Sequence, residues 1–176
     1  MVNISYVSCV EESKGLDTLL EIARILQAEH VDKYVKIDFY GQKKDHFFDE
    51  HLADIAMFEY TGLLQPEEVI PTLQEYDALI FPSHYVGKGC PGILVEALSA
   101  GLPIIASNWK YNSEFVTNGL NGFHCETFNP KAYVDAIIQL CNEPLRQRMS
   151  KSAYAKSEIF SADKARKQMD IYSSRI

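Results

Sequence analysis

The chain has 176 residues, of which 47% are hydrophobic and 23% charged. This is the composition of an ordinary globular protein, and it excludes a disordered, collagen-like or coiled-coil chain. The length predicts one compact domain rather than two.

The charge is unevenly distributed along the chain. In total, 17 Lys and Arg residues stand against 24 Asp and Glu residues, a net charge of −7, so we expect no nucleic-acid partner. Residues 144–176, however, contain eight basic and three acidic residues, a net charge of +5. This segment is predicted to form a basic helical tail, which is either solvated or a local docking face.

The cysteines and the apolar runs indicate the compartment. Cys9, Cys90, Cys125 and Cys141 have no metal-ligand spacing, and no secretory signal is recognisable. No apolar run approaches the roughly 18 residues of a membrane span. The sequence therefore predicts a reduced, cytoplasmic chain without a bound metal or a transmembrane segment, which leaves room for peripheral membrane contact.

Short β-rich apolar runs alternate with helical periodicity along the whole chain, which predicts an α/β fold with a parallel sheet. Strands are expected over residues 4–9, 35–40, 57–61, 78–81, 103–107 and 122–125. Helices are expected after Gly15, from Pro66, over 92–100, after Asn129 and in the tail. Three of these helices have apolar residues at the spacing of a core-facing side. These residues are Leu16, Leu19, Leu20, Ala23 and Leu26 after Gly15; Val69, Ile70 and Leu73 after Pro66; and Tyr133, Ala136, Ile137, Leu140 and Cys141 after Asn129.

Two loops stand out, residues 8–15 after the first strand and 83–92 after the fourth, because parallel strand ends and helix starts meet at one edge of a sheet. The second loop has the spacing GxGxxG. A dinucleotide fingerprint is disfavoured, since Pro91 interrupts the glycines and no acidic residue ends the next strand. The pattern favours a backbone that closes onto a phosphate, with a plain glycine-rich turn as the alternative.

Three side chains near these loops are candidate ligand contacts. Glu96 interrupts an apolar helix one turn beyond the glycines, and a carboxylate can accept two hydrogen bonds from the vicinal diol of a ribose. Lys14 can neutralise a diphosphate as a point charge. His84 is a candidate sugar or phosphate contact. The alternatives are a surface glutamate, a solvated lysine and an ordinary loop histidine.

The segments VSCVEESKGLDTLLEIA and GCPGILVEALSAGLPIIASNWKYNSEFVTNGLNGF resemble the donor-binding domain of GT-B glycosyltransferases of family 4. The similarity spans nearly the whole chain, and NWKYNSE is most similar to bacterial members that build capsular or extracellular polysaccharide. The resemblance implies a Rossmann-like parallel sheet with helices on both faces over residues 1–176, one half of a GT-B fold. The acceptor-binding N-terminal domain is then missing, and this half alone is expected to bind donor without transferring sugar.

The resemblance also implies an activity. The whole enzyme is expected to transfer a hexosyl unit, with retention and without a metal or other cofactor, from a UDP- or GDP-sugar to a growing polysaccharide or a lipid-linked acceptor. Glu96 is implied to be the second acid of the E-x7-E motif and to bind the ribose, and Lys14 to contact the diphosphate. The further donor contacts are the backbone around Leu63 and Leu64 for the base, the amides near Gly92, Ile93 and Leu94 for the phosphates, and Cys9, Gly15, His84 and Gly89 in the two loops.

Two positions depart from the family pattern. Lys88 stands where the first acid of E-x7-E is expected, and Cys9 stands where the family has an arginine. A charge-assisted hydrogen bond contributes about 1.5 to 3 kcal/mol, so the loss of the arginine predicts donor binding weakened on the order of 10- to 100-fold. Our hypothesis is that Lys88 partly compensates for the missing cation, which leaves a weak or altered donor site, and joins Glu96 and Lys14 as a catalytic residue.

Two other classes of function remain open from the sequence. Lys88 and Cys9 favour a non-catalytic sugar-nucleotide-binding or interaction module with a degenerate site. A nicotinamide-dependent oxidoreductase would need a ribose-binding acid after Ser107, and this sequence has none there.

Overall fold

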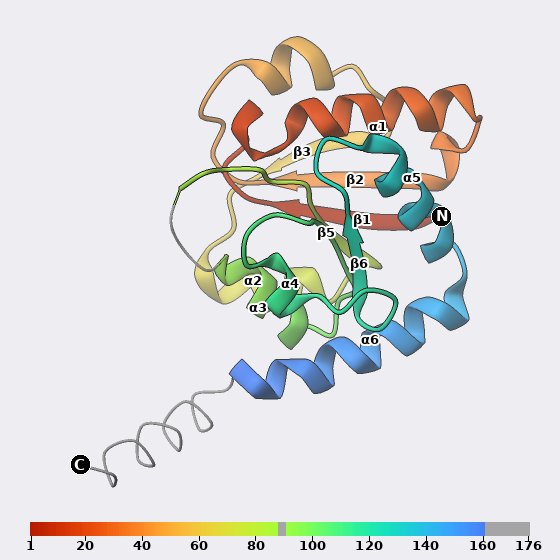
Figure 1. Ribbon diagram of the computed structural model, residues 1–176. Helices are drawn as coiled ribbons and strands as arrows, with labels where there is room; N and C mark the ends of the chain where they lie inside the picture. Colours follow the sequence, from red (N-terminus) through yellow and green to blue (C-terminus); the bar gives the residue numbers. More distant parts are fainter. Residues whose placement is uncertain (88–90, 161–176) are drawn as a thin grey trace, which may run out of the picture.

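The computed structural model describes residues 1–87 and 91–160. These residues form a six-stranded parallel sheet in the order β3-β2-β1-β4-β5-β6 (Figure 1). The strands are β1 (Val2–Val7), β2 (Val35–Tyr40), β3 (Phe58–Gly62), β4 (Ala78–Phe81), β5 (Ile104–Ser107) and β6 (Gly122–Cys125). All six predicted strands are present; β1 begins and ends two residues earlier than predicted, because its pairing with β2 starts at Val2.

Helices cover both faces of this sheet, as predicted. They are α1 (Leu16–Ala28), α2 (Pro66–Leu73), α3 (Gly92–Ser99), α4 (Asn112–Phe115), α5 (Pro130–Leu140) and α6 (Glu143–Ser157). Helices α1 and α5 pack together on one face, whereas α2 and α3 lie on the other and α6 runs beneath them (Figure 1). Short 3-10 turns span Glu12–Lys14, Asp32–Tyr34 and Glu158–Phe160, and a π-helical turn spans Phe48–Leu52.

The start of α5 and the end of α3 lie at the capping residues that the sequence indicates. Asn129 accepts a hydrogen bond from the Ala132 amide at 3.4 Å and so caps α5, with Pro130 as the first helical residue. Helix α3 ends just before Gly101, whose φ of 70° is left-handed and suits a glycine after a helix.

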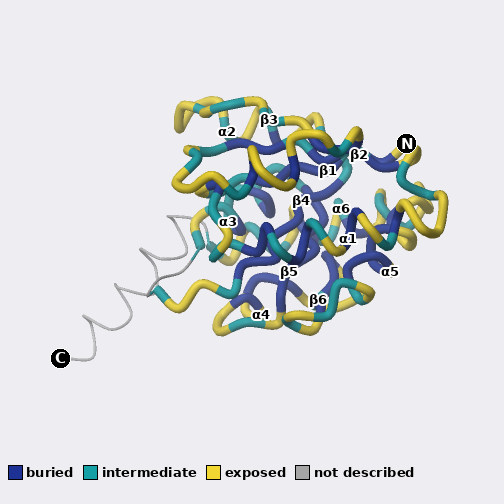
Figure 2. The backbone as a smooth tube through the Cα atoms, turned by 90° about the horizontal axis from the view of Figure 1, so that it is seen from above, coloured by how far each residue is buried: buried dark blue, intermediate teal, exposed yellow. Residues whose placement is uncertain are grey.

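The central strands are buried on both faces, as in other covered parallel sheets (Figure 2). Two predicted core residues are exceptions. Ile70 is 37% exposed, because α2 buries only the narrow stripe of Val69 and Leu73. Cys141 is exposed, because it follows the last residue of α5 where the chain turns into α6.

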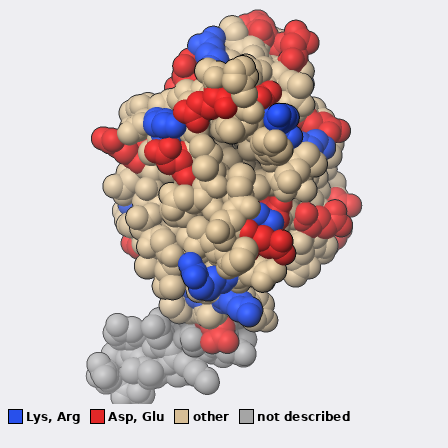
Figure 3. Space-filling view, turned by 90° about the vertical axis from the view of Figure 1, so that its right-hand side faces the viewer, with Lys and Arg blue, Asp and Glu red and all other residues tan. Residues whose placement is uncertain are grey.

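The basic tail is described as far as Phe160, and residues 161–176 lie outside the described part. Arg146 forms an ion pair with Asp77 at 3.1 Å, and Lys156 donates to Thr117 Oγ1 at 3.0 Å. Two basic side chains of α6 therefore hold the helix to the acidic body. Figure 3 shows basic and acidic side chains interspersed over one face of the molecule. Among the described residues, no helix is both long and apolar enough to cross a membrane.

Candidate functional site

The two loops that the sequence singled out follow neighbouring strands. Strand β1 pairs with β2 on one side and with β4 on the other, so the order of the sheet reverses between β1 and β4. Ligands of open α/β sheets bind at this switch point, outside the carboxyl ends of the strands. The structure therefore brings the loop 8–15 and residues 83–87 of the second loop together where a ligand is expected.

Gly15 joins the two loops by a close backbone approach. Its φ is 90°, in the left-handed region, and a Cβ atom at this position would lie 2.6 Å from the carbonyl oxygen of Pro82. Only glycine tolerates both the conformation and the contact. Gly15 was predicted as a donor contact, and the structure shows a packing role for it.

A pocket of about 370 Å³ opens at this edge of the sheet. Its wall comes from the ends of β1 and β4, the loops that follow β1, β4 and β5, and the first turn of α3. The lining residues are Val7, Ser8, Lys14, Phe81, Ser83, Tyr85, Gly87, Pro91, Ile93, Trp109, Lys110, Tyr111 and Asn112. The loop after β5 is thus a third part of the site, which the sequence analysis did not include.

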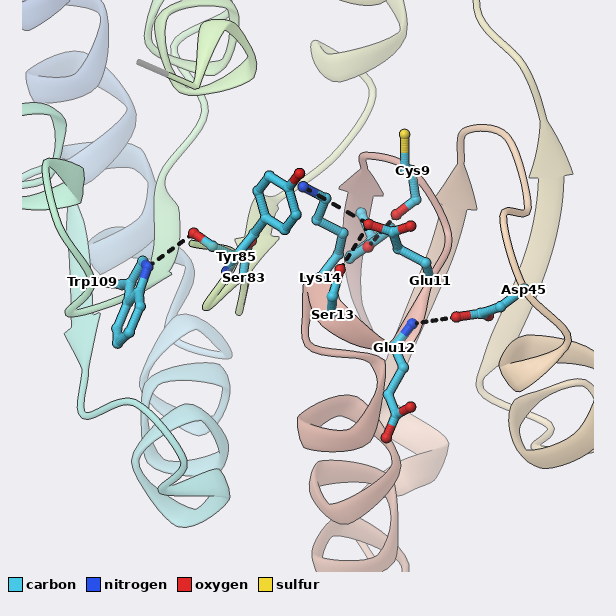
Figure 4. A network of polar contacts seen from close by, with 10 residues as sticks. Cys9, Glu11, Glu12, Ser13, Lys14, Asp45, Ser83, Tyr85 and Trp109 are labelled. Atoms are coloured by element: carbon cyan, nitrogen blue, oxygen red, sulfur yellow. Dashed lines mark hydrogen bonds and ion pairs between the residues drawn. The ribbon is translucent and has the colours of Figure 1, made fainter. Parts of the chain in front are cut away.

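Lys14 lies in the wall of this pocket. Its Nζ atom is 3.2 Å from the centroid of the Tyr85 ring and 4.0 Å from Glu11 Oε1 (Figure 4). The Lys14 side chain is 16% exposed. The ammonium group therefore has an aromatic ring as its nearest partner, and the side chain as a whole retains a small accessible surface.

The loop after β4 begins with a buried polar cluster. The Ser107 hydroxyl, at the end of β5, donates to the Ser83 carbonyl at 2.6 Å. The Asn112 side chain donates in turn to the carbonyl and hydroxyl oxygens of Ser107, at 3.0 and 3.2 Å. These contacts satisfy buried polar groups and fix the start of the loop against β5.

The same loop is held further along by the loop after β5. The Trp109 indole N–H donates to the Tyr85 carbonyl at 3.1 Å (Figure 4). The Lys110 ammonium donates to the carbonyls of Val86 and Gly87. Three successive carbonyls of the loop therefore accept hydrogen bonds from two side chains of its neighbour.

The first turn of α3 is open toward the edge of the sheet. Gly92 is exposed, and a Cβ atom on it would meet no described atom within 4 Å. The Leu94 amide donates to the Pro91 carbonyl at 3.0 Å and is therefore not free to meet a phosphate. The amides of Gly92 and Ile93 are the remaining candidates of this turn.

Glu96 lies in the middle of α3 and is half-buried. It is not among the residues that line the pocket, and within the described residues its carboxylate has no hydrogen bond or ion pair. Among the described residues the carboxylate is thus unpaired, one turn from the exposed Gly92. The structure does not bring it into the same cavity as Lys14.

The other predicted donor contacts among the described residues are not part of the pocket lining. Cys9 is exposed at the start of the loop after β1, with its carbonyl accepting the Tyr6 hydroxyl at 2.9 Å. Leu63, which is 67% exposed, and Leu64 line a separate shallow pocket after β3. His84 is half-buried, with its ring 4.8 Å from that of Phe128.

Two predicted residues, Lys88 and Gly89, lie outside the described part of the chain. Of the residues that line the pocket, only Lys14 and Ile93 were predicted as site residues, so Tyr85, Trp109 and Lys110 are among those that were missed. A signal for Tyr85 was present, since an aromatic residue stood between two polar loop residues and the glycines. Trp109 and Lys110 contributed only to the family resemblance and were given no role in the site, because their contacts are with a loop 24 residues away in the sequence.

Within residues 1–87 and 91–160, no group of three His, Cys, Asp or Glu side chains is arranged to hold a metal ion. The polar groups of the pocket wall are cations, amides and hydroxyls. Such groups suit an anionic ligand.

An open parallel sheet with this strand order defines a doubly wound α/β domain of the Rossmann class, here with a lysine at its switch point. The family model described as glycosyl transferases group 1 matches residues 3–156, and the chain belongs to this family. The family confirms the GT-B resemblance, and the sheet confirms the predicted Rossmann-like fold.

Known proteins of the family are similar over most of this chain. A glycogen synthase of Mycobacterium tuberculosis is 26% identical over 151 residues, which are 84% of this chain and 36% of the relative. A poly(ribitol-phosphate) alpha-N-acetylglucosaminyltransferase of Staphylococcus aureus is 25% identical over 142 residues, 79% of this chain and 28% of the relative. This chain thus spans about a third of the length of these two relatives.

The fold is also that of solved structures. The crystal structure of Anabaena HepE in complex with UDP superposes with a TM-score of 0.80, over 99% of this chain and 49% of that one, at 17% sequence identity. At this identity the likeness shows the fold alone.

Proposed function

We propose that this chain is the donor-binding domain of a retaining, metal-independent glycosyltransferase of family 4 that uses a UDP- or GDP-sugar. The observation that carries the proposal is the pocket at the switch point, where Lys14 and the open first turn of α3 line one cavity. A diphosphate needs a cation and free amides, and a helix N-terminus supplies such amides.

The diphosphate, the ribose and the base of the donor each have a candidate partner in this arrangement. Lys14 and the amides of Gly92 and Ile93 bind the diphosphate. Glu96, whose carboxylate is unpaired among the described residues, accepts hydrogen bonds from the ribose hydroxyls when the donor is bound. The backbone at the end of β3, near Leu63, receives the base.

The relatives support this assignment. Two are named as a glycogen synthase and as an N-acetylglucosaminyltransferase, and the HepE structure was solved with UDP. On the same grounds we propose that the whole enzyme transfers a hexosyl unit to a growing polysaccharide or a lipid-linked acceptor. The acceptor is bound by a second domain, so the chain alone binds donor but transfers no sugar. The place of action is the cytoplasm, with peripheral contact to a membrane.

Cys9 favours a second candidate function. It is exposed at the end of β1, where the family resemblance places an arginine. A site without that cation fits a non-catalytic module that binds a sugar nucleotide. Donor hydrolysis or transfer by the chain, supplied with its acceptor domain, would separate an enzyme from such a module.

Calorimetric titration of the full chain with UDP, GDP, their sugars, UMP and NAD tests the proposed function. We expect a nucleoside diphosphate to bind more tightly than UMP and NAD. Lys14→Met and Glu96→Gln should each weaken UDP or GDP binding about tenfold, the loss of one charge-assisted hydrogen bond. Glu143→Gln, at the start of α6, is the matched control. Equal affinity in wild type and both site variants would refute the proposal.

A further inference from the structure

We propose that Tyr85 is a positioning residue of the donor site, whose ring holds the Lys14 ammonium in the pocket wall while Trp109 and Lys110 hold Tyr85 in place. This inference rests on the proposed function, because it concerns the cation that meets the diphosphate. It assigns a task to a loop contact that the family resemblance did not include.

The contact between Lys14 and Tyr85 is the first step. A lysine ammonium within about 6 Å of a ring centroid is attracted by the negative face of the ring, and here the distance is 3.2 Å. Glu11 forms a longer ion pair with the same ammonium group, at 4.0 Å, which is beyond hydrogen-bond distance. The ring is therefore the nearer of the two partners that fix the end of this flexible four-carbon side chain.

The second step is the anchoring of Tyr85 itself. Its carbonyl accepts from the Trp109 indole at 3.1 Å, and the next two carbonyls accept from Lys110. Lys110 has a φ of 47°, a left-handed conformation that non-glycine residues adopt at a cost. The loop after β5 therefore contacts the loop that bears Tyr85 through a residue, Lys110, whose backbone is strained.

The ring forms the wall of the pocket and does not fill it. Both Lys14 and Tyr85 line the cavity of about 370 Å³, and 16% of the Lys14 side chain remains exposed. Among the described lining residues, the Lys and Arg side chains are Lys14 and Lys110, and Lys110 is engaged with carbonyls. Binding of an anion in the pocket therefore depends on how the Lys14 side chain is oriented, since the ammonium group of Lys110 is already hydrogen-bonded to the Val86 and Gly87 carbonyls.

The test is the affinity of the full chain for UDP and GDP, measured by calorimetry with Tyr85 variants. Tyr85→Phe keeps the ring and should bind as wild type does. Tyr85→Leu removes the ring and should bind about three- to tenfold more weakly, the range expected for a partly desolvated cation–π contact. Trp109→Phe removes the indole donor and should show a smaller loss of the same kind.

A double-mutant cycle shows whether Tyr85 acts through Lys14. In a Lys14→Met background, Tyr85→Leu should cause no further loss, because the ring then has no cation to hold. Tyr34→Leu is the matched control, since Lys33 Nζ lies 5.1 Å from the Tyr34 ring far from the pocket. That variant should bind nucleotide as wild type does.

The outcomes separate the two proposals. If the wild-type chain binds neither UDP nor GDP, the proposed function fails. If it binds one of them and Tyr85→Leu binds equally or more tightly, the ring is neutral or blocks the site, and only the positioning role of Tyr85 is overturned. An equal loss in Tyr85→Leu with and without Lys14 would overturn it as well.

Discussion

Gly15, the residue before helix α1, lies directly against Pro82, so that a Cβ atom on Gly15 would lie 2.6 Å from the Pro82 carbonyl oxygen. The contact joins the loop after β1 to the end of β4.

Replacing Gly15 tests this contact. Gly15→Ala should lower the free energy of unfolding by about 2 kcal/mol or more, because alanine at a left-handed φ is strained and its methyl group would collide with backbone. Urea denaturation measures the change. Gly92→Ala is the control, since a Cβ there meets no described atom within 4 Å. Equal stability of Gly15→Ala and wild type would contradict the close approach.

Two buried tyrosines predict a loss of stability in alkali. Burial raises the pKa of Tyr6 and of Tyr133 well above the usual value near 10. Above pH 10 the unfolded chain releases these protons while the folded chain keeps them, so the unfolded state binds fewer protons and the free energy of unfolding falls. Each tyrosine should contribute a slope of about 1.4 kcal/mol per pH unit.

Urea titrations between pH 8 and about 11 measure this slope. Tyr6→Phe keeps the ring and removes one titrating hydroxyl, at the loss of its hydrogen bond to the Cys9 carbonyl. The variant should therefore be less stable at pH 8 but lose stability less steeply. A slope that does not differ between the two proteins would show that Tyr6 titrates normally in the fold.

The described cysteines should differ in reactivity. Burial, with a smaller effect of Asp135, raises the pKa of the Cys125 thiol to about 12, whereas Cys9 and Cys141 are exposed. At pH 8, iodoacetamide should label the two exposed thiols long before Cys125, because only the thiolate reacts. Mass spectrometry of peptides measures each site.

Nucleotide should protect only one of these thiols. If Cys9 is a donor contact, saturating UDP or GDP should slow its alkylation severalfold and leave Cys141 unchanged, since Cys141 lies at the far end of α5. Unprotected alkylation of Cys9, under conditions where calorimetry shows binding, would remove it from the donor site.

We expect the proposed donor site to need no divalent cation. If Lys14 and the amides of the first turn of α3 neutralise the diphosphate as proposed, excess EDTA should leave the dissociation constant of UDP or GDP unchanged within about twofold. Calorimetry with and without the chelator measures this. An affinity that falls with EDTA and returns with Mg²⁺ would place a metal in the site.

The sequence predicted the strands, the helix boundaries and the loops of interest from local features. Asn129 and Gly101 mark helix ends by their own backbone and side-chain chemistry. Gly15 and Lys14 were found because they follow a strand and precede a helix. Burial was predicted less well. Ile70 was expected to face the core together with Leu73, but only a narrow side of α2 packs against the rest of the domain, and Ile70 lies outside it.

What the sequence determined by itself is the alternation of strands and helices and the position of two ligand-type loops, because propensity, periodicity and capping act over a few residues. The tertiary structure alone decided that these loops are neighbours, that Tyr85 lies on Lys14, and that the loop after β5 holds Tyr85. The reason is physical: strand order and side-chain packing depend on contacts between segments 24 to 74 residues apart, which no local pattern encodes.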